Sequence, residues 1–580
     1  MASPNEQPVA PGPPATGNRW ALGVSLAAMA VTCLPYLFGM MLTGAHQALA
    51  WFSWLGYNLD DSCVYLSWMR QVADGSPFQR NLFTVEPQAG HQFNVLFLAL
   101  GLIARFTGAP LLLIYHGARI VAGLAFLRAL WWLLGMVTPK LPARKVCFLT
   151  VLVSAGVGWL PGQWRASGIN SPADVWQPEA ITWLCLYLSP LFLVSLLLMV
   201  GVLGWLLRAS RTGSREAALL AGGCGLLLGN IHTYDVITLI VVWVAWLGVT
   251  ALLQRRLDVR AWLLSLGAGA LTGISSAHML WIVRTEAVFA KRVAVATLSP
   301  SPMLYVLGYG LLLPLALGGL YLALRRDGDE RPDAPGALPA RTAALFLFTW
   351  AAANLVAAYL PVPFQRKMLM GAHLPIACLA GLCLASAAER VPARGRVWAT
   401  TAALALLGAT NVRFMLRDTG NFSQNRGQSR IQRPYMHAGE VSALLWLREH
   451  TRAGEAVQPL PWVAISGQGK AAFVDTTAAC FAPGLTGRAV HAGHWGETPD
   501  FGATMGRWVR FQMPGTPDAE RRELLRASGV RYLLFSQLRS WTADPATRDA
   551  IRSVLTSAPY LRLQEGASSD DAEVYEVVEP

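Results

Sequence analysis

Apolar stretches close to the length that crosses a bilayer recur along most of this 580-residue chain. They predict helices at 20–42, 111–136, 146–161, 180–207, 216–231, 234–253, 261–283, 302–324, 342–361, 369–388 and 396–415. A further apolar piece at 95–104 is too short to span and predicts a re-entrant or interfacial segment. The pattern therefore predicts a polytopic α-helical membrane protein with about 11 transmembrane helices, which form a domain over 20–420.

The pattern of hydrophobic and polar residues changes at about residue 430. The stretch "EVSALLWLREHTRAGEAVQPLPW" predicts an amphipathic helix and then a strand, and "DAERRELLRASGVRYLLFSQL" predicts a helix, a glycine stop and a buried strand. Residues 430–580 therefore form a small C-terminal α/β soluble domain. At the other end, the Pro-rich residues 1–19 are expected to be disordered, and 20–42 is expected to be a retained helix because no small-residue cleavage site follows it.

The composition agrees with a membrane protein, since 54% of the residues are hydrophobic and only 14% are charged. The net charge of +13 comes from basic residues in short loops between alternate helices, not from one patch, which argues against nucleic acid as a partner. Because basic loops stay in the cytoplasm, the N-terminus is predicted to be cytoplasmic and the protein to be a multi-pass inner-membrane protein. The loop 43–110 and the domain 430–580 then lie on the extracytoplasmic side.

Two adjacent acids, Asp60 and Asp61, open the long polar loop after the first predicted helix. Acidic groups close to hydrocarbon are costly and usually functional, so the pair is a candidate catalytic site. A helical spacing of apolar residues follows it and predicts an amphipathic helix on the membrane surface: Val64, Tyr65, Trp68, Met69 and Val72. The alternative is that one of the two acids merely caps this helix.

Further along the same loop, Glu86, His91 and Asn94 offer oxygen and nitrogen ligands. With the acidic pair they could hold a divalent metal ion, although their spacing matches no compact metal motif. The metal requirement is left open, and the alternative is that they are solvated loop residues.

Two other external segments carry candidate substrate-binding residues. Glu179 stands at the mouth of the predicted 180–207 helix, where it could equally stabilise the helix dipole. His232 and Asp235 lie in a very short turn between two hydrophobic helices, where desolvation requires that they have partners.

A third segment, "PVPFQRKMLMGAHLP", places Gln365, Arg366 and Lys367 at the external end of a predicted helix. Adjacent cations at a helix start suit a phosphate group. The alternative is that they reach towards lipid head groups.

Two further features lie on the polar side. Cys63 and Cys480 are the only two of the eight cysteines outside apolar runs, so a bridge between them is possible. The stretch "HAGHWGETPDF", which begins at His491, lacks zinc-protease spacing and predicts a loop that could cover the membrane site.

The chain has no Walker loop, no GxGxxG that opens a helix after a strand, and no GxSxG, which argues against an ATP-driven pump or a dinucleotide enzyme. The first-loop "DD", the helix after it, the segment "GHQFNVLFLALGLIARFTG" and the external C-terminal domain resemble the GT-C superfamily of lipid-linked-sugar glycosyltransferases. This superfamily includes protein O-mannosyltransferases and aminoarabinose transferases. The segments "DVWQPEA", "NIHTYD", "FQRKMLMGAHLP" and "AGHWGETPDF" look like those of a bacterial subgroup with this design. The family's usual His-Pro-Pro is here His91-Gln92-Phe93, a departure from the mannosyltransferase branch.

The resemblance implies a GT-C-like fold and a glycosyltransferase of the hexosyltransferase class. Its donor would be a polyprenyl-phosphate-linked sugar, and its acceptor a glycan, lipid or protein outside the cytoplasm. In this family a first-loop Asp activates or positions the acceptor, and external cations hold the polyprenyl phosphate. The resemblance therefore implies the first role for Asp60 or Asp61 and the second for Arg366 and Lys367. The alternative is a non-enzymatic lipid-linked glycan transporter or an assembly subunit of an envelope polysaccharide system.

Overall fold

The structure is a computed structural model and describes residues 17–43, 51–162, 168–325, 336–427, 431–466, 469–536 and 545–578. Of the predicted disordered segment 1–19, residues 1–16 lie outside this part of the chain, and the first helix already begins at Asn18.

Eight helices in the described residues are long and apolar enough to cross a membrane. They are α1 (Asn18–Leu42), α4 (Leu111–Val137), α7 (Pro190–Thr212), α9 (Tyr234–Gln254), α10 (Val259–Thr285), α14 (Ala340–Ala357), α15 (His373–Glu389) with the preceding 3-10 turn η4 (Gln365–Leu369), and α16 (Ala393–Ser423). The prediction of a polytopic helical membrane protein is therefore confirmed.

The remaining predicted spans differ from single long helices. The helices α12 (Pro302–Tyr309) and α13 (Leu312–Leu324) make a ninth span only if they are counted together, and they are bent by 75°. The helices α5 (Leu141–Val153) and α8 (Arg215–Ile231) have 13 and 17 residues. Only α5 falls clearly below the length of about 17–25 residues that crosses a bilayer, and α8 is at its lower limit. The predicted 180–207 helix is divided into η3 (Pro178–Ala180), α6 (Thr182–Leu188) and α7, because the chain is extended at Ser189 before Pro190. Eight or nine spans thus stand against about 11 apolar stretches.

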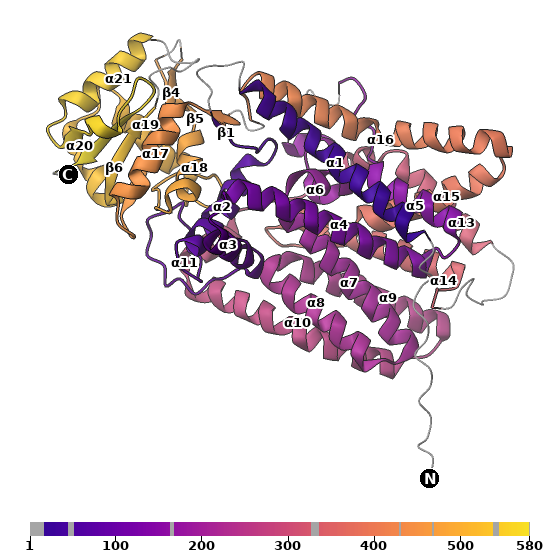
Figure 1. Ribbon diagram of the computed structural model, residues 1–580. Helices are drawn as coiled ribbons and strands as arrows, with labels where there is room; N and C mark the ends of the chain where they lie inside the picture. The colour runs from indigo at the N-terminus through magenta and orange to yellow at the C-terminus, as the bar shows by residue number, and fades with distance from the viewer. Residues whose placement is uncertain are drawn as a thin grey trace. The chain divides into compact units, whose positions relative to one another are not determined.

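Small residues let neighbouring membrane helices approach closely. The helices α8 and α10 run side by side (Figure 1), and Gly225 and Gly229 of α8 face α10. A Cβ atom on Gly225 would lie 2.0 Å from Thr272 Oγ1, and one on Gly229 would lie 2.2 Å from Ser275 Oγ. Glycine is therefore required on this face, as is common where membrane helices pack.

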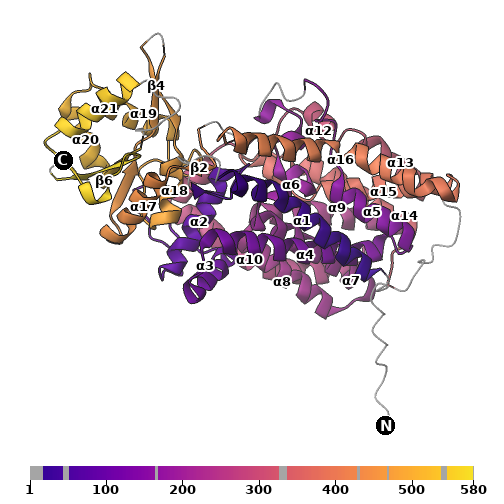
Figure 2. The same cartoon turned by 45° about the horizontal axis from the view of Figure 1, so that its top comes forward.

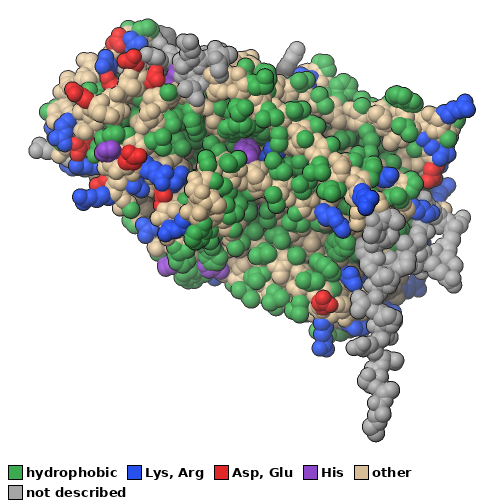
Figure 3. Space-filling view, in the orientation of Figure 1, with side chains coloured by type: hydrophobic (Ala, Val, Ile, Leu, Met, Phe, Trp, Pro, Cys, Tyr) green, Lys and Arg blue, Asp and Glu red, His purple; other side chains and the backbone are tan. Residues whose placement is uncertain are grey.

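Large apolar side chains are exposed on the outer faces of these helices, including Leu219, Ile240 and Leu263. Figure 3 shows that hydrophobic side chains cover most of the surface over the long helices, whereas Lys and Arg gather towards its ends. Such a surface is stable only in contact with lipid.

The chain divides into two compact units. The first contains residues 1–33, 118–281 and 296–415, and the second contains residues 34–117, 282–295 and 416–580. The first loop and the C-terminal domain, which the sequence places in separate domains, are therefore parts of one unit.

In the second unit, the first loop contains three helices or strands: β1 (Trp51–Phe52), α2 (Leu59–Ala73) and α3 (Val95–Thr107). The helix predicted after the acidic pair is α2, but the prediction that it lies on the membrane surface is wrong. All five of its predicted apolar residues are buried, and so are Ser62, Ser67 and Gln71 on its other faces. They are buried because α2 packs against α3 and against α18 (Thr477–Thr486), as Figures 1 and 2 show. The predicted 95–104 segment is α3, a helix of 13 residues, too short to span.

The C-terminal part contains two small sheets and five α-helices in its described residues. They are β2 (Tyr435–Met436), α17 (Ala438–His450), β3 (Ala456–Pro459), β4 (Trp462–Ile465), β5 (Ala471–Asp475), α18, α19 (Phe501–Gln512), α20 (Asp518–Ser528), β6 (Val530–Phe535), α21 (Pro545–Ser557), β7 (Leu561–Leu563) and β8 (Glu573–Val577). The main sheet has the order β3-β6-β8-β7, with β3 and β6 parallel and the other pairs antiparallel. In addition, β4 pairs with β5, and β1 of the first loop pairs with β2.

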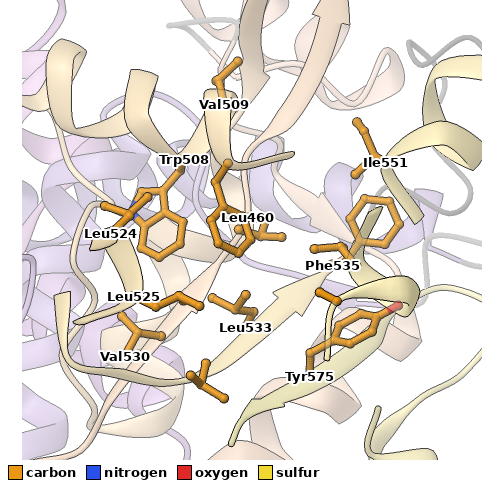
Figure 4. Close-up of a cluster of buried hydrophobic side chains, with 14 of the residues drawn as sticks. Leu460, Trp508, Val509, Leu524, Leu525, Val530, Leu533, Phe535, Ile551 and Tyr575 are labelled. Carbon is orange, nitrogen blue, oxygen red and sulfur yellow. The ribbon is translucent and has the colours of Figure 1, made fainter. Parts of the chain in front are cut away.

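Both sequence predictions for this domain are confirmed. The helix α17 is followed by β3, and α20 ends at Gly529, whose φ of +58° stops the helix before the buried strand β6. Leu533 and Phe535 of β6 lie in one apolar core with Trp508 of α19 and Leu525 of α20 (Figure 4).

A buried ion network joins the start of this domain to its strands. The Arg433 guanidinium donates to Asp475 at 2.8 Å and to Glu440 at 2.9 Å, and it stacks on Trp462 at 3.9 Å. Arg433 is buried, as are both carboxylates. Its charge is therefore fully compensated by hydrogen-bonded partners.

Candidate functional site: the acidic pair and a cation cluster

Asp60 and Asp61 lie in the first turn of α2. The N-cap is Asn58, in the left-handed region with a φ of 59°, so neither acid is the cap that the alternative interpretation required. The positive end of the helix dipole stabilises negative charge at these two positions.

The C-terminal loop 491–500 contacts both acids from within the same unit. Trp495 Nε1 donates a hydrogen bond of 2.8 Å to Asp60 Oδ2, and His494 Nε2 lies 3.6 Å from Asp61 Oδ1. The other ring nitrogen, His494 Nδ1, accepts hydrogen bonds from the backbone N–H groups of Gly496 and Glu497 at 3.0 and 3.1 Å. The neutral ring therefore has its proton on Nε2, where it faces Asp61.

The surroundings of the pair alter its acidity. Burial, followed by the charge of Asp61, raises the pKa of Asp60 above its usual range. The positive charge that His494 carries when it is protonated, and the hydrogen bond from Trp495, act in the opposite direction but are smaller. A carboxylate with a raised pKa is a better proton acceptor than an ordinary surface Asp.

The loop that contacts the acids is itself held in place. Thr498 Oγ1 donates to the carbonyl of Phe83 at 2.8 Å, and Asn81 Nδ2 donates to the carbonyl of Glu497 at 2.8 Å. The Glu497 carboxylate also pairs with Arg292 of α11 (Ala287–Ala294) at 2.7 Å. Side chains from the first loop, α11 and the C-terminal loop therefore fix the position of His494 and Trp495. The sequence predicted a loop here but not that His494 and Trp495 contact the acidic pair. The only sign of these contacts in the sequence was the cluster of polar residues in "HAGHWGE".

The other predicted residues of the first loop have structural partners. Glu86 pairs with Lys291 at 2.7 Å, and the backbone N–H of His91 donates to the buried Glu286 at 3.1 Å. Asn94 is the N-cap of α3 and accepts from two backbone N–H groups. These contacts anchor the loop. Among the residues that the structure describes, no three His, Cys, Asp or Glu side chains are grouped so that they could hold a metal ion.

The first unit contains a separate group of the predicted residues. The Arg366 guanidinium stacks on Trp176 at 5.3 Å, and Lys367 Nζ lies 4.5 Å from the centre of the Tyr234 ring. Gln177 Nε2 donates to the carbonyl of Arg366 at 2.9 Å, which fixes the backbone of the turn η4. Aromatic faces are a favourable setting for cations that must stay partly desolvated.

Acidic residues complete this group. Burial raises the pKa of Glu179, whereas the charges of Arg366 and Lys367 and of His232 oppose that shift, so Glu179 lies within electrostatic reach of all three. His232 Nδ1 is 2.8 Å from Asp235 Oδ2, and Asp235 is fully buried. Neither Arg366 nor Lys367 forms an ion pair within 4 Å with a carboxylate of the described residues. The two cations therefore retain capacity for an anionic ligand. We call this group the cation cluster: Glu179, His232, Asp235, Arg366 and Lys367.

Gln365 has a different role from its neighbours. Its Oε1 accepts from the N–H of Ser299 at 3.2 Å, and its Nε2 donates to the carbonyl of Leu360 at 2.9 Å. Both ends of the amide are therefore used to hold the turn, and Gln365 positions the cations.

One buried acid was not predicted. Asp174, in the 3-10 turn η2 (Ala173–Val175), accepts from the N–H of Gly158 at 2.9 Å, and its Oδ1 has no hydrogen-bond partner in the structure. Burial raises its pKa to about 7. Its burial could not be predicted from the sequence, because an Asp in a polar loop is usually solvated.

No protein-family model and no curated protein matches the chain. Several solved structures are similar to it. The oligosaccharyltransferase of Archaeoglobus fulgidus, in complex with Zn and sulfate, is 13% identical with a TM-score of 0.46, over 88% of this chain and 68% of its own. ArnT from Cupriavidus metallidurans, bound to undecaprenyl phosphate, is 13% identical with a TM-score of 0.49, over 97% of this chain and 98% of its own. The arabinosyltransferase EmbB from Mycobacterium smegmatis is 14% identical with a TM-score of 0.38, over 96% of this chain and 42% of its own.

All three are GT-C glycosyltransferases, the superfamily that the sequence resembles. With identities of 13–14% and TM-scores below 0.5, the similarity concerns the fold and supports no conclusion about activity, substrate or site residues.

Proposed function

We propose that this protein transfers a sugar from a polyprenyl-phosphate-linked donor to an acceptor on the extracytoplasmic side of the inner membrane. The acceptor is a glycan, a lipid or a protein. The observation that supports this proposal best is the acidic pair at the start of α2, in which Asp60 has a raised pKa and a fixed hydrogen bond from Trp495. The proposal rests on this chain's own residues and on the resemblance in sequence.

The proposed chemistry is a single displacement. An acceptor hydroxyl is a poor nucleophile, and Asp60 takes its proton as the oxygen attacks the anomeric carbon. The bond from that carbon to the phosphate oxygen breaks, its electron pair leaves with the phosphate, and the configuration of the sugar inverts. Asp61, which faces the Nε2–H of His494, stays ionised and keeps Asp60 basic through its charge.

The cation cluster is the proposed site for the leaving phosphate. Negative charge grows on the phosphate oxygens as the sugar leaves, and Arg366 and Lys367 would stabilise it. Glu179 balances part of their charge in the absence of the donor. Two cations that lie on aromatic faces and have no ion pair with a described carboxylate fit a phosphate better than they fit simple contact with lipid head groups. Their side chains are half-buried and have less freedom to follow the lipid.

The competing function is that of a lipid-linked glycan transporter or an assembly subunit. Transporter folds place their substrate between paired broken helices. In the described residues a single pair of helices, α12 and α13, meets the criterion for a broken span. This gives no specific support to a transporter.

The decisive experiment is mass spectrometry of lipids and glycans from a strain that lacks the protein. A glycosyltransferase predicts that one polyprenyl-linked sugar accumulates on the extracytoplasmic side and that one glycoconjugate loses that sugar. Wild-type protein and the exposed control Glu523→Gln should restore both, whereas Asp60→Asn should restore neither at equal protein level. Accumulation of the lipid-linked sugar on the cytoplasmic side would instead indicate a transporter and contradict the proposal.

A further inference from the structure

Two cysteines that lie about four hundred residues apart in sequence meet beside the acidic pair. Cys63 lies on α2, one helical turn after Asp60, and Cys480 lies on α18. Both side chains have an exposed fraction of 0%, and each thiol is close enough to alter the pKa of the other. Both are free thiols in the structure. The geometry therefore brings together the only two cysteines that the sequence places outside apolar runs.

The two helices are packed along their length, so the contact between the thiols does not depend on one flexible side chain. Arg70 Nε of α2 donates to the carbonyl of Gly484 on α18 at 3.2 Å. A Cβ atom on Gly484 would lie only 3.0 Å from Leu66 Cβ, so α18 has a glycine at a place where the two helices approach closely. Cys63 lies one turn before Leu66 and Cys480 one turn before Gly484, so the same packing brings the two cysteines to one level of the helix pair.

Another pair of buried cysteines provides an internal comparison. Cys147 of α5 and Cys378 of α15 are also close, but there the Cys147 thiol donates to the backbone carbonyl of Cys378 at 3.4 Å. Those two residues lie in apolar membrane segments, where cysteine behaves as a small hydrophobic side chain. Cys63 and Cys480 differ because their helices lie in the unit that carries the first loop, outside the apolar membrane segments.

We propose that Cys63 and Cys480 form a disulfide bond that fixes α2, and with it the acidic pair, to the C-terminal domain. The proposal rests on the extracytoplasmic orientation inferred above, because disulfides persist in oxidising compartments. It is independent of whether the protein transfers a sugar.

The bond would form by exchange with a disulfide of an extracytoplasmic oxidant protein. The thiolate of one cysteine attacks that disulfide and gives a mixed disulfide, and the thiolate of the second cysteine then displaces the oxidant. The chain loses two electrons and two protons, and the oxidant leaves as a dithiol. Since both sulfurs are fully buried in the folded unit, the exchange takes place before α2 and α18 have packed.

The test counts thiols in the full-length protein. Cells are lysed directly into denaturant with excess N-ethylmaleimide, and the intact protein is weighed with and without prior reduction. The chain has eight cysteines. A bridge predicts that six thiols are labelled without reduction and eight after it. Eight labelled thiols without reduction would overturn the proposal.

Serine variants assign the bond to this pair. In Cys63→Ser and in Cys480→Ser, all remaining seven thiols should be labelled without reduction, since the partner of the missing cysteine is then free. Cys378→Ser is the matched control and should still lose two thiols to the bridge. If Cys63→Ser retained an unlabelled pair, the disulfide would lie elsewhere and the assignment would be wrong. Because labelling takes place in denaturant, the counts do not require the variants to fold.

Discussion

Replacing Asp60 by Asn tests the proposed general base most directly. The substitution keeps the shape of the side chain, and its amide oxygen can still accept the hydrogen bond that Trp495 Nε1 donates at 2.8 Å. What is lost is the negative charge and the ability to take a proton. Expression and membrane insertion should therefore remain at the wild-type level.

Two magnitudes separate the catalytic role from a structural one. A hydrogen bond to a charged group contributes about 1.5–3 kcal/mol and one between neutral groups about 0.5–1.5 kcal/mol, so the weaker contact with Trp495 costs about 1–1.5 kcal/mol. This corresponds to about a tenfold change in rate. Loss of a general base costs about 10²–10⁴-fold. We therefore expect Asp60→Asn to lower the rate of transfer by at least about a hundredfold.

The assay measures single-turnover transfer from the lipid-linked sugar that accumulates in the deletion strain, with saturating donor and detection of the product by mass spectrometry. Asp61→Asn should retain more activity than Asp60→Asn, because Asp61 acts through its charge on Asp60. If both single variants kept rates within about tenfold of wild type, the loss would fit a hydrogen bond alone, and the general-base proposal would be refuted.

The pH dependence of the same rate provides an independent check. The base must be ionised, so transfer should fall on acidification through the pKa of Asp60, which lies above that of an ordinary Asp. Asp61→Asn removes one of the causes that raise this pKa and should move the acid limb to lower pH. Trp495→Phe removes a hydrogen bond that lowers it and should move the limb to higher pH. Two shifts in the same direction would contradict the assignment of Asp60.

The remaining predictions concern the phosphate, the topology and the stability. Arg366→Ala and Lys367→Ala should each raise the apparent KM for the donor by about tenfold to a hundredfold, because a charge-assisted hydrogen bond contributes about 1.5–3 kcal/mol; an unchanged KM in both would favour contact with lipid head groups. A cysteine introduced at Lys140 should react with a membrane-impermeant maleimide only from the cytoplasmic side, and labelling from outside would reverse the proposed orientation. Arg433→Met should lower the free energy of unfolding by about 3–5 kcal/mol, since it leaves two buried carboxylates unpaired, whereas the exposed control Arg562→Met should cost less than about 1 kcal/mol. Thermal unfolding in detergent compares these two variants, and equal losses would show that the buried network adds nothing to stability.

The position of the helices follows largely from the sequence, because apolar runs and helix stops act locally. Most predicted spans begin and end within a few residues of the observed helices, and Gly529 ends α20 as predicted. The local hydrophobic pattern did not predict features that depend on packing between distant elements. The apolar residues of α2 were compatible with a membrane surface, but α3 and α18 bury them instead. The division of 180–207 at Ser189 and the bend between α12 and α13 are likewise not visible in hydropathy.

For the candidate site, the sequence alone identified the residue types and not their partners. It indicated Asp60, Arg366 and Lys367 because charged groups are rare and costly near hydrocarbon. Only the tertiary structure brought His494 and Trp495 to the acidic pair and Cys480 to Cys63, since these contacts join residues about four hundred positions apart. Hydrophobic periodicity reports whether a side chain faces the core or the solvent, but a contact between distant segments depends on how whole elements pack, and no local pattern contains that information.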